Sequence, residues 1–207
     1  MRIAIFGATG SVGRHLVDQA LQAGHEVTAF SRNPESLAVS HDRLRIVRGD
    51  VRLLADVNAA VEGQDAVFCT LGAGRDGSLR SEGTRNIVDA MLAAGVRRFI
   101  CQTTLGAGDS AGNLTFFWKY IMFGLLLRAA FADHERQEAI VRDSSLDWTI
   151  VRPGAFTDGP LTGQYRSGFS GSDKNLKLKI SRADVAHFLL RVLDEKSGLH
   201  SAISVSN

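Results

Sequence analysis

Short apolar runs alternate with longer amphipathic segments along this chain. Runs of four to six mostly apolar residues predict strands, and apolar residues that recur every three or four positions predict helices between them. The predicted strands are 3–6, 26–30, 44–47, 66–70, 98–103, 148–151, 176–180 and 202–205, and the predicted helices are 12–23, 56–61, 82–94, 133–142 and 182–193.

This order of elements predicts the fold class. Strands that alternate with helices form βαβ units, in which the strands are parallel and the crossovers are right-handed. We therefore expect an α/β fold, with a doubly wound, mainly parallel Rossmann sheet and helices on both of its faces. Neither a linker nor an internal repeat divides residues 1–207, so we expect a single domain over this span.

One apolar segment, Leu114–Phe131, follows the fifth predicted strand and does not match the βαβ pattern. Four of its residues recur at helical spacing and predict one apolar helix face: Phe116, Tyr120, Phe123 and Leu127. The segment is either a helix that contacts the core or a second copy of the chain, or a lid around residues 105–132 over a substrate pocket. Contact with a membrane surface is the least favoured interpretation, and internal charges argue against a span.

Composition and charge narrow the function classes. The 207 residues are 44% hydrophobic and 22% charged, as in ordinary folded domains, and the net charge of +2 argues against nucleic-acid binding. Cys69 and Cys101 lie in apolar runs, which predicts buried free thiols in a reducing compartment and no metal site. We expect a cytoplasmic protein without a leader segment, acting as a monomer or dimer.

The strongest chemical signal is the sequence GATGSVG at 7–13, between the first strand and the first helix. Glycines there let backbone N–H groups approach a pyrophosphate, and the helix N-terminus favours an anion. The turn predicts cofactor binding by Gly7, Thr9, Gly10, Ser11, Val12 and Gly13.

The end of the second strand indicates which dinucleotide binds. An NAD site carries Asp or Glu at this point to hold the ribose 2′-hydroxyl, whereas this chain has Ser31 and Arg32. A guanidinium pairs with a 2′-phosphate, so NADP(H) is the expected cofactor. Alternatively, Arg32 is only a solvated surface charge.

Several motifs together resemble the atypical short-chain dehydrogenase/reductases over nearly the whole chain: GATGSVG (7–13), SRNP (31–34), GDV (49–51), SEGTRNIVDAM (81–91) and TIVRPG (149–154). Within that group, SEGTRNIV, the Asp-His pair at 133–134 and PLTGQY at 160–165 resemble the biliverdin reductase B (flavin reductase) branch most. The NmrA-like branch is also similar, and some of its members sense NADP without catalysing a reaction.

The resemblance implies further cofactor contacts. Adenine would be held by Asp50 and Val51, and the ribose and pyrophosphate would pass Leu71 and Gly72. The nicotinamide would lie near Thr103 and Thr104 and be lined by Pro153, Gly154 and Ala155. All of these residues follow predicted strands, at the edge where doubly wound sheets bind ligands.

This sequence also departs from the family pattern at the substrate end. The Tyr-x-x-x-Lys pair is absent, because Gly124 follows Tyr120 and Phe169 follows Tyr165 at the required spacing. The histidine that the biliverdin reductase B branch carries after a Pro-Pro pair has no equivalent here, because Gly154 follows Arg152-Pro153, and Thr104 replaces the branch's serine on the fifth strand.

Two functions remain open from the sequence. The first is an NADPH-dependent reductase that transfers hydride to a planar small molecule, such as a flavin or a linear tetrapyrrole, which takes its proton from solvent. Thr104 and His134 are its candidate catalytic residues, and His134 is the better titrating group. The second is a non-catalytic NADP-binding regulator or scaffold of the NmrA-like type.

Overall fold

The computed structural model describes residues 1–72, 77–173, 175–195 and 198–207. Its main sheet has the strand order β3-β2-β1-β4-β5-β6-β10-β8. The strands of this sheet are β1 (Arg2–Phe6), β2 (Glu26–Ser31), β3 (Leu44–Arg48), β4 (Ala66–Cys69), β5 (Arg98–Gln102), β6 (Asp147–Pro153), β8 (Arg166–Ser167) and β10 (Ser201–Ser206). The α-helices are α1 (Gly13–Gln22), α2 (Leu54–Val61), α3 (Leu79–Ala94), α4 (Arg128–Asp143) and α5 (Arg182–Asp194).

The sheet reverses its winding direction between β1 and β4. From β1 the chain moves outward through β2 to β3, and it then returns to pair β4 with the other side of β1. All pairs in this sheet are parallel except β10 with β8. The predicted doubly wound Rossmann fold is therefore confirmed, and its ligand crevice is expected at the carboxyl ends of β1 and β4.

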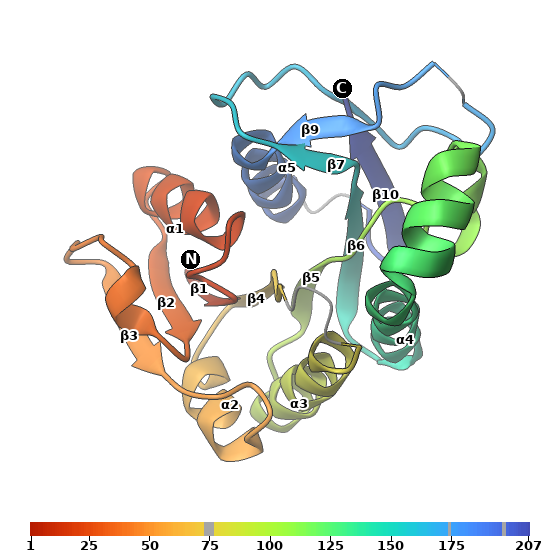
Figure 1. The fold of residues 1–207 in the computed structure, drawn as a ribbon. Coiled ribbons are helices and arrows are strands. Elements are labelled where there is room, and N and C mark those ends of the chain that lie inside the picture. Colours follow the sequence, from red (N-terminus) through yellow and green to blue (C-terminus); the bar gives the residue numbers. More distant parts are fainter. Residues whose placement is uncertain (73–76, 174, 196–197) are drawn as a thin grey trace.

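Helices cover both faces of the sheet, α1 and α5 on one side and α2, α3 and α4 on the other (Figure 1). Side chains alternate between these faces along each strand. In β1, Ile3 and Ile5 belong to the apolar cluster under α1 and α5, whereas Ala4 and Phe6 belong to the opposite cluster. Both faces of β1 are thus buried, which explains its continuous apolar run.

The strand predicted at 176–180 begins later and pairs elsewhere. Leu178 has a φ of 55°, a left-handed conformation that interrupts an extended strand, so β9 spans only Lys179–Ser181. It pairs in parallel with β7 (Ala155–Thr157) in a separate two-stranded sheet beside the main one. The short strand β8, antiparallel to β10, lies within a glycine-rich stretch at 159–171 and was not predicted.

The aromatic segment is helical, but its hydrogen bonding differs from the prediction. Residues Phe117–Leu126 form a π-helix (η3), which follows a 3₁₀ segment at Gly108–Asn113 (η2) and leads into α4. Because each π turn holds more residues than an α turn, the predicted apolar face is broken. Phe116 and Tyr120 are 73% and 54% exposed, while Phe123 is partly buried. Within the described residues, no helix is both long and apolar enough to cross a membrane.

Candidate cofactor and substrate site

The turn after β1 requires glycine for reasons internal to the chain. Gly7 has a φ of 85°, and a Cβ there would lie 2.6 Å from the carbonyl oxygen of Thr70, which follows β4. A Cβ at Gly13 would lie 2.1 Å from the carbonyl oxygen of Gly7. The two glycines therefore let the turn close against β4 and let α1 pack against the turn.

The N-terminus of α1 is suited to an anion. Val12 is the N-cap residue, and no side chain caps this helix end. Ser11, Val12 and Gly13 thus lie where helix N–H groups and the helix dipole favour a phosphate. The uncapped N-terminus of α1 therefore fits the pyrophosphate of a dinucleotide.

A cavity of about 140 Å³ extends from this turn along the β1–β4 crevice. Its lining includes these residues of the predicted cofactor site: Gly7, Thr9, Gly10, Ser31, Arg32, Val51, Leu71 and Gly72. Sequence reasoning missed three others in the lining: Phe30, Gly49 and Leu79. Asp50 is not part of this lining, and its carboxylate accepts the backbone N–H of Arg52 at 2.9 Å.

The end of β2 is held against the glycine turn. The hydroxyls of Thr9 and Ser31 are 2.8 Å apart, so one donates to the other. Next to them, the exposed Arg32 lines the cavity, and its guanidinium pairs with no carboxylate among the described residues. At the end of β2 this cavity therefore offers a cation, and its described lining contains no acidic residue. In a dinucleotide-binding fold, the adenosine ribose would lie at this point.

A second cavity of about 210 Å³ meets the first one at Leu71 and Gly72, which line both. Predicted residues on its walls are Thr103, Thr104, His134, Pro153, Gly154 and Ala155. Apolar side chains close it from η3, from β7 and from neighbouring loops, and these are Leu105, Leu114, Trp118, Phe123, Phe156 and Leu178. Arg80 and Gln102 complete the described lining.

The two threonines after β5 differ in what their hydroxyls can reach. Thr103 is buried and donates its hydroxyl proton to Glu138 at 2.8 Å. Glu138 also accepts two hydrogen bonds from the guanidinium of Arg152, at 2.8 and 2.6 Å. Thr104 is less engaged, since among the described residues its hydroxyl makes only a 3.4 Å contact, with the carbonyl of Leu105. Thr104 is thus the hydroxyl that is more available to a ligand.

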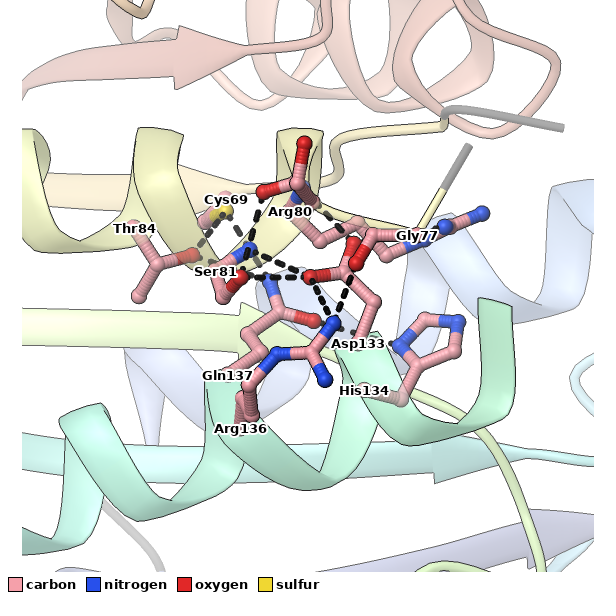
Figure 2. A network of polar contacts seen from close by, with 10 residues as sticks. Cys69, Gly77, Arg80, Ser81, Thr84, Asp133, His134, Arg136 and Gln137 are labelled. Atoms are coloured by element: carbon pink, nitrogen blue, oxygen red, sulfur yellow. Dashed lines mark hydrogen bonds and ion pairs between the residues drawn. The ribbon is translucent and has the colours of Figure 1, made fainter. Parts of the chain in front are cut away.

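His134 lies at the end of a buried polar network (Figure 2). Its Nδ1 is 3.2 Å from the side-chain oxygen of Gln137. Burial, helped by the charge of Arg80, lowers the pKa of His134 to about 4. The sequence prediction assumed a titrating histidine near its ordinary pKa of 6.5, and this assumption was wrong because the cavity wall desolvates the ring.

The neighbouring Asp133 has a structural role in the same network. This fully buried carboxylate accepts the backbone N–H groups of Arg80 and Ser81 at 3.0 and 3.1 Å, and the Ser81 hydroxyl at 2.5 Å. It therefore caps α3 from α4, which is why α3 begins at Leu79 instead of the predicted residue 82.

Sequence reasoning missed the polar residues that support the site. Arg152, within TIVRPG, is 1% exposed and is held by Glu138 and by Asp109. Gln137 is fully buried beside His134. A buried Arg in an apolar strand and a Gln on the inner face of a helix were the available signals, but neither identifies its partner.

Comparisons with known proteins agree with this geometry. An uncharacterized chloroplastic protein of Arabidopsis thaliana is 33% identical over 177 residues, which cover 78% of this chain and 61% of that protein. ChuY of Escherichia coli O157:H7, an anaerobillin reductase, superposes with a TM-score of 0.80 at 25% identity and covers all of this chain and 97% of its own. A short-chain dehydrogenase/reductase from Veillonella parvula, solved with NADP, shares the fold with a TM-score of 0.82 at 23% identity, over all of this chain and 94% of that one.

A family model described as NAD(P)H-binding matches residues 7–196. The match begins at the first glycine of the turn and includes both cavities, so the expectation of a nicotinamide dinucleotide cofactor is confirmed. The chain belongs to the NAD(P)H-binding family.

Proposed function

We propose that this protein is an NADPH-dependent reductase that transfers hydride to a planar acceptor, such as a flavin or a linear tetrapyrrole. The observation that carries the proposal is the 210 Å³ cavity, whose walls are largely apolar and aromatic and which shares Leu71 and Gly72 with the dinucleotide crevice. A flat, conjugated molecule matches such walls, because aromatic side chains stack on its faces.

NADPH supplies the hydride, and the chain's own residues bind and orient it. The glycine turn and the N-terminus of α1 would hold the pyrophosphate, and Arg32 would pair with the 2′-phosphate. Val51, with Asp50 beside it, would contact adenine. Thr103 and the segment Pro153–Ala155 would position the nicotinamide at the entrance of the second cavity. Each of these roles is part of the proposal.

The polar groups of the second cavity support an acceptor that needs no enzymatic acid. Among the described residues that line it, none is Tyr, Lys, Asp or Glu. His134, with a pKa of about 4, is neutral at pH 7 and cannot supply a proton as an imidazolium. A simple ketone needs a donor for its developing alkoxide, whereas a flavin or tetrapyrrole accepts hydride into a conjugated system and takes its proton from solvent. The missing Tyr-x-x-x-Lys pair supports the same view, and with it a place among the atypical short-chain dehydrogenase/reductases.

The segment 105–132 is proposed as the lid of this cavity. Trp118 and Phe123 line the cavity from η3, with their ring centroids 5.7 Å apart. Phe123 also stacks on Phe131 at the start of α4, which ties the lid to the helix that carries His134. The two cavity-facing rings are the surfaces on which a planar acceptor would rest.

The test is the oxidation of NADPH, followed by its absorbance, with FMN, FAD and biliverdin as acceptors. We expect turnover with at least one of them. Phe123→Ala should lower kcat/KM about tenfold, because one base-sized stacking contact contributes roughly 1–3 kcal/mol. The matched control is Phe116→Ala, since Phe116 is 73% exposed and does not line the cavity.

The same assay separates the second candidate. A non-catalytic regulator or scaffold of the NmrA-like type would bind NADP tightly and turn over none of the three acceptors. The absence of an ordinary acid from the described cavity lining is compatible with that function as well, so tight binding without turnover would replace the reductase proposal.

A further inference from the structure

Gln137 links His134 to the interior of the protein. Its side-chain nitrogen donates to the hydroxyl of Thr84 at 3.0 Å and contacts the sulfur of Cys69 at 3.6 Å. Its side-chain oxygen lies 3.2 Å from Nδ1 of His134. In Figure 2, Gln137 lies between Cys69 and His134, and the imidazole is at the outer end of the network.

This arrangement decides which ring nitrogen of His134 carries the proton. The amide nitrogen of Gln137 donates to the Thr84 hydroxyl, and its amide oxygen faces the histidine. That oxygen can only accept a hydrogen bond, and Nδ1 must therefore carry the proton and donate it. A neutral imidazole has one N–H, so Nε2 is left with a free lone pair.

The charges around His134 keep the ring neutral. Burial and, after it, the charge of Arg80 on α3 lower its pKa to about 4, against the opposing effects of the Gln137 hydrogen bond and of Asp133 and Glu138 on its own helix. Protonation of Nε2 near neutral pH would place a second cation beside the Arg80 guanidinium. The imidazole and Arg80 both line the 210 Å³ cavity.

We propose that His134 is a specificity-determining residue that accepts a hydrogen bond at Nε2 from an N–H of the substrate, while Arg80 donates to the adjacent carbonyl oxygen. The recognised group is an N–H next to a C=O, as in the imide edge of an isoalloxazine or in a lactam ring. Gln137 is then a positioning residue, because it fixes the tautomer of His134. The substrate part of this inference rests on the proposed reductase function, and the tautomer does not.

The tautomer is tested first, without substrate. Long-range ¹H–¹⁵N spectra of protein with ¹⁵N-labelled histidine distinguish protonated from unprotonated ring nitrogens, and His134→Gln identifies the signals that belong to His134. We expect protonated Nδ1 and unprotonated Nε2 throughout pH 5.5–8. Gln137→Leu should give a mixture of tautomers, and Gln137→Glu should raise the pKa of His134 into the measured range. An Nε2–H tautomer or an imidazolium at pH 7 in the unmodified protein would overturn the inference.

The substrate preference is tested with lumiflavin and its 3-methyl derivative, which lacks the imide N–H. We expect the unmodified protein to prefer lumiflavin by about tenfold in kcat/KM, the contribution of one hydrogen bond in a buried site. His134→Gln keeps an acceptor and should keep most of this preference. His134→Leu has similar bulk but no acceptor and should lose it. If His134→Leu still rejects the methylated flavin, exclusion is steric and the inference is wrong.

Failure of the two proposals gives different results. If neither flavin is reduced, the proposed function fails, and binding of the oxidised flavins to the NADP-loaded protein, measured by flavin fluorescence, still reports the preference. If both flavins are reduced equally by the unmodified protein, the reductase proposal stands and the role given to His134 falls.

Discussion

The hydroxyl of Ser81, in the first turn of α3, donates a 2.5 Å hydrogen bond to the carboxylate of Asp133 on α4. The Asp-His pair of the sequence thus combines two different roles in adjacent positions. Asp133 faces inward and caps another helix, whereas His134 lines the 210 Å³ cavity.

Removal of this cap should cost stability. We expect Asp133→Ala to lower the free energy of unfolding by about 2–4 kcal/mol, because it removes a helix cap and leaves the buried N–H groups of Arg80 and Ser81 without their acceptor. Ser81→Ala should cost only about 1 kcal/mol. Urea denaturation of both variants and of the double variant measures the coupling. Strictly additive effects of the two substitutions would contradict the contact.

Alanine substitutions at two glycines of the cofactor site should have different effects, one on stability and the other on NADPH binding. Gly13→Ala places a Cβ 2.1 Å from the Gly7 carbonyl oxygen and should destabilise the fold by at least about 2 kcal/mol. At Gly72, by contrast, a Cβ meets nothing within 4 Å. We expect Gly72→Ala to change stability by less than about 0.5 kcal/mol but to weaken NADPH binding, since it intrudes on the crevice. Thermal unfolding with calorimetric NADPH titration separates the two effects.

Cofactor choice is expected to depend on Arg32. Arg32→Ala should weaken NADPH binding about tenfold or more, because a charge-assisted contact to phosphate contributes roughly 1.5–3 kcal/mol, and should leave NADH nearly unchanged. Arg45→Ala is the matched control, since Arg45 is exposed on β3 and lines neither site cavity. Equal weakening of the two dinucleotides would sink the assignment of the 2′-phosphate to Arg32.

Stability should depend on pH through His134. Its pKa is about 4 in the folded protein against 6.5 in the unfolded chain. Between these values the unfolded chain binds a proton that the folded protein does not, so stability is full above pH 6.5 and falls as the pH falls toward 4. The loss at pH 5 is about 2 kcal/mol. In His134→Leu this part of the loss between pH 7.5 and 5 should disappear, and an unchanged difference would show that His134 titrates normally.

Much of the fold could be predicted because its signals are local. The glycine turn at 7–13 and the alternation of apolar runs with helices identify the winding without any knowledge of distant contacts. Leu178 shows the limit of this reasoning, because an apolar residue in an alternating apolar and polar sequence is typical of a strand and gives no sign of a positive φ.

The candidate site was less predictable because its polar parts meet across the fold. Glu138 reaches Thr103 from 35 positions away, and Asp133 reaches Ser81 from 52. These pairings depend on how α4 packs on α3 and on the sheet, which no sequence spacing encodes. The altered pKa of His134 has the same origin, since it follows from burial and from Arg80 on another helix.

The π-helical hydrogen bonding of η3 determines how a change in chain length would alter the aromatic lining of the second cavity. A π turn corresponds to an α-helix that carries one additional residue. Deleting a single residue within 117–126 would remove one π turn and rotate the residues that follow by about 100°, so a different aromatic ring would face the cavity. For the lid and the reductase function proposed above, a change of one residue in the length of this segment should therefore alter the range of acceptors as strongly as a substitution in the pocket wall.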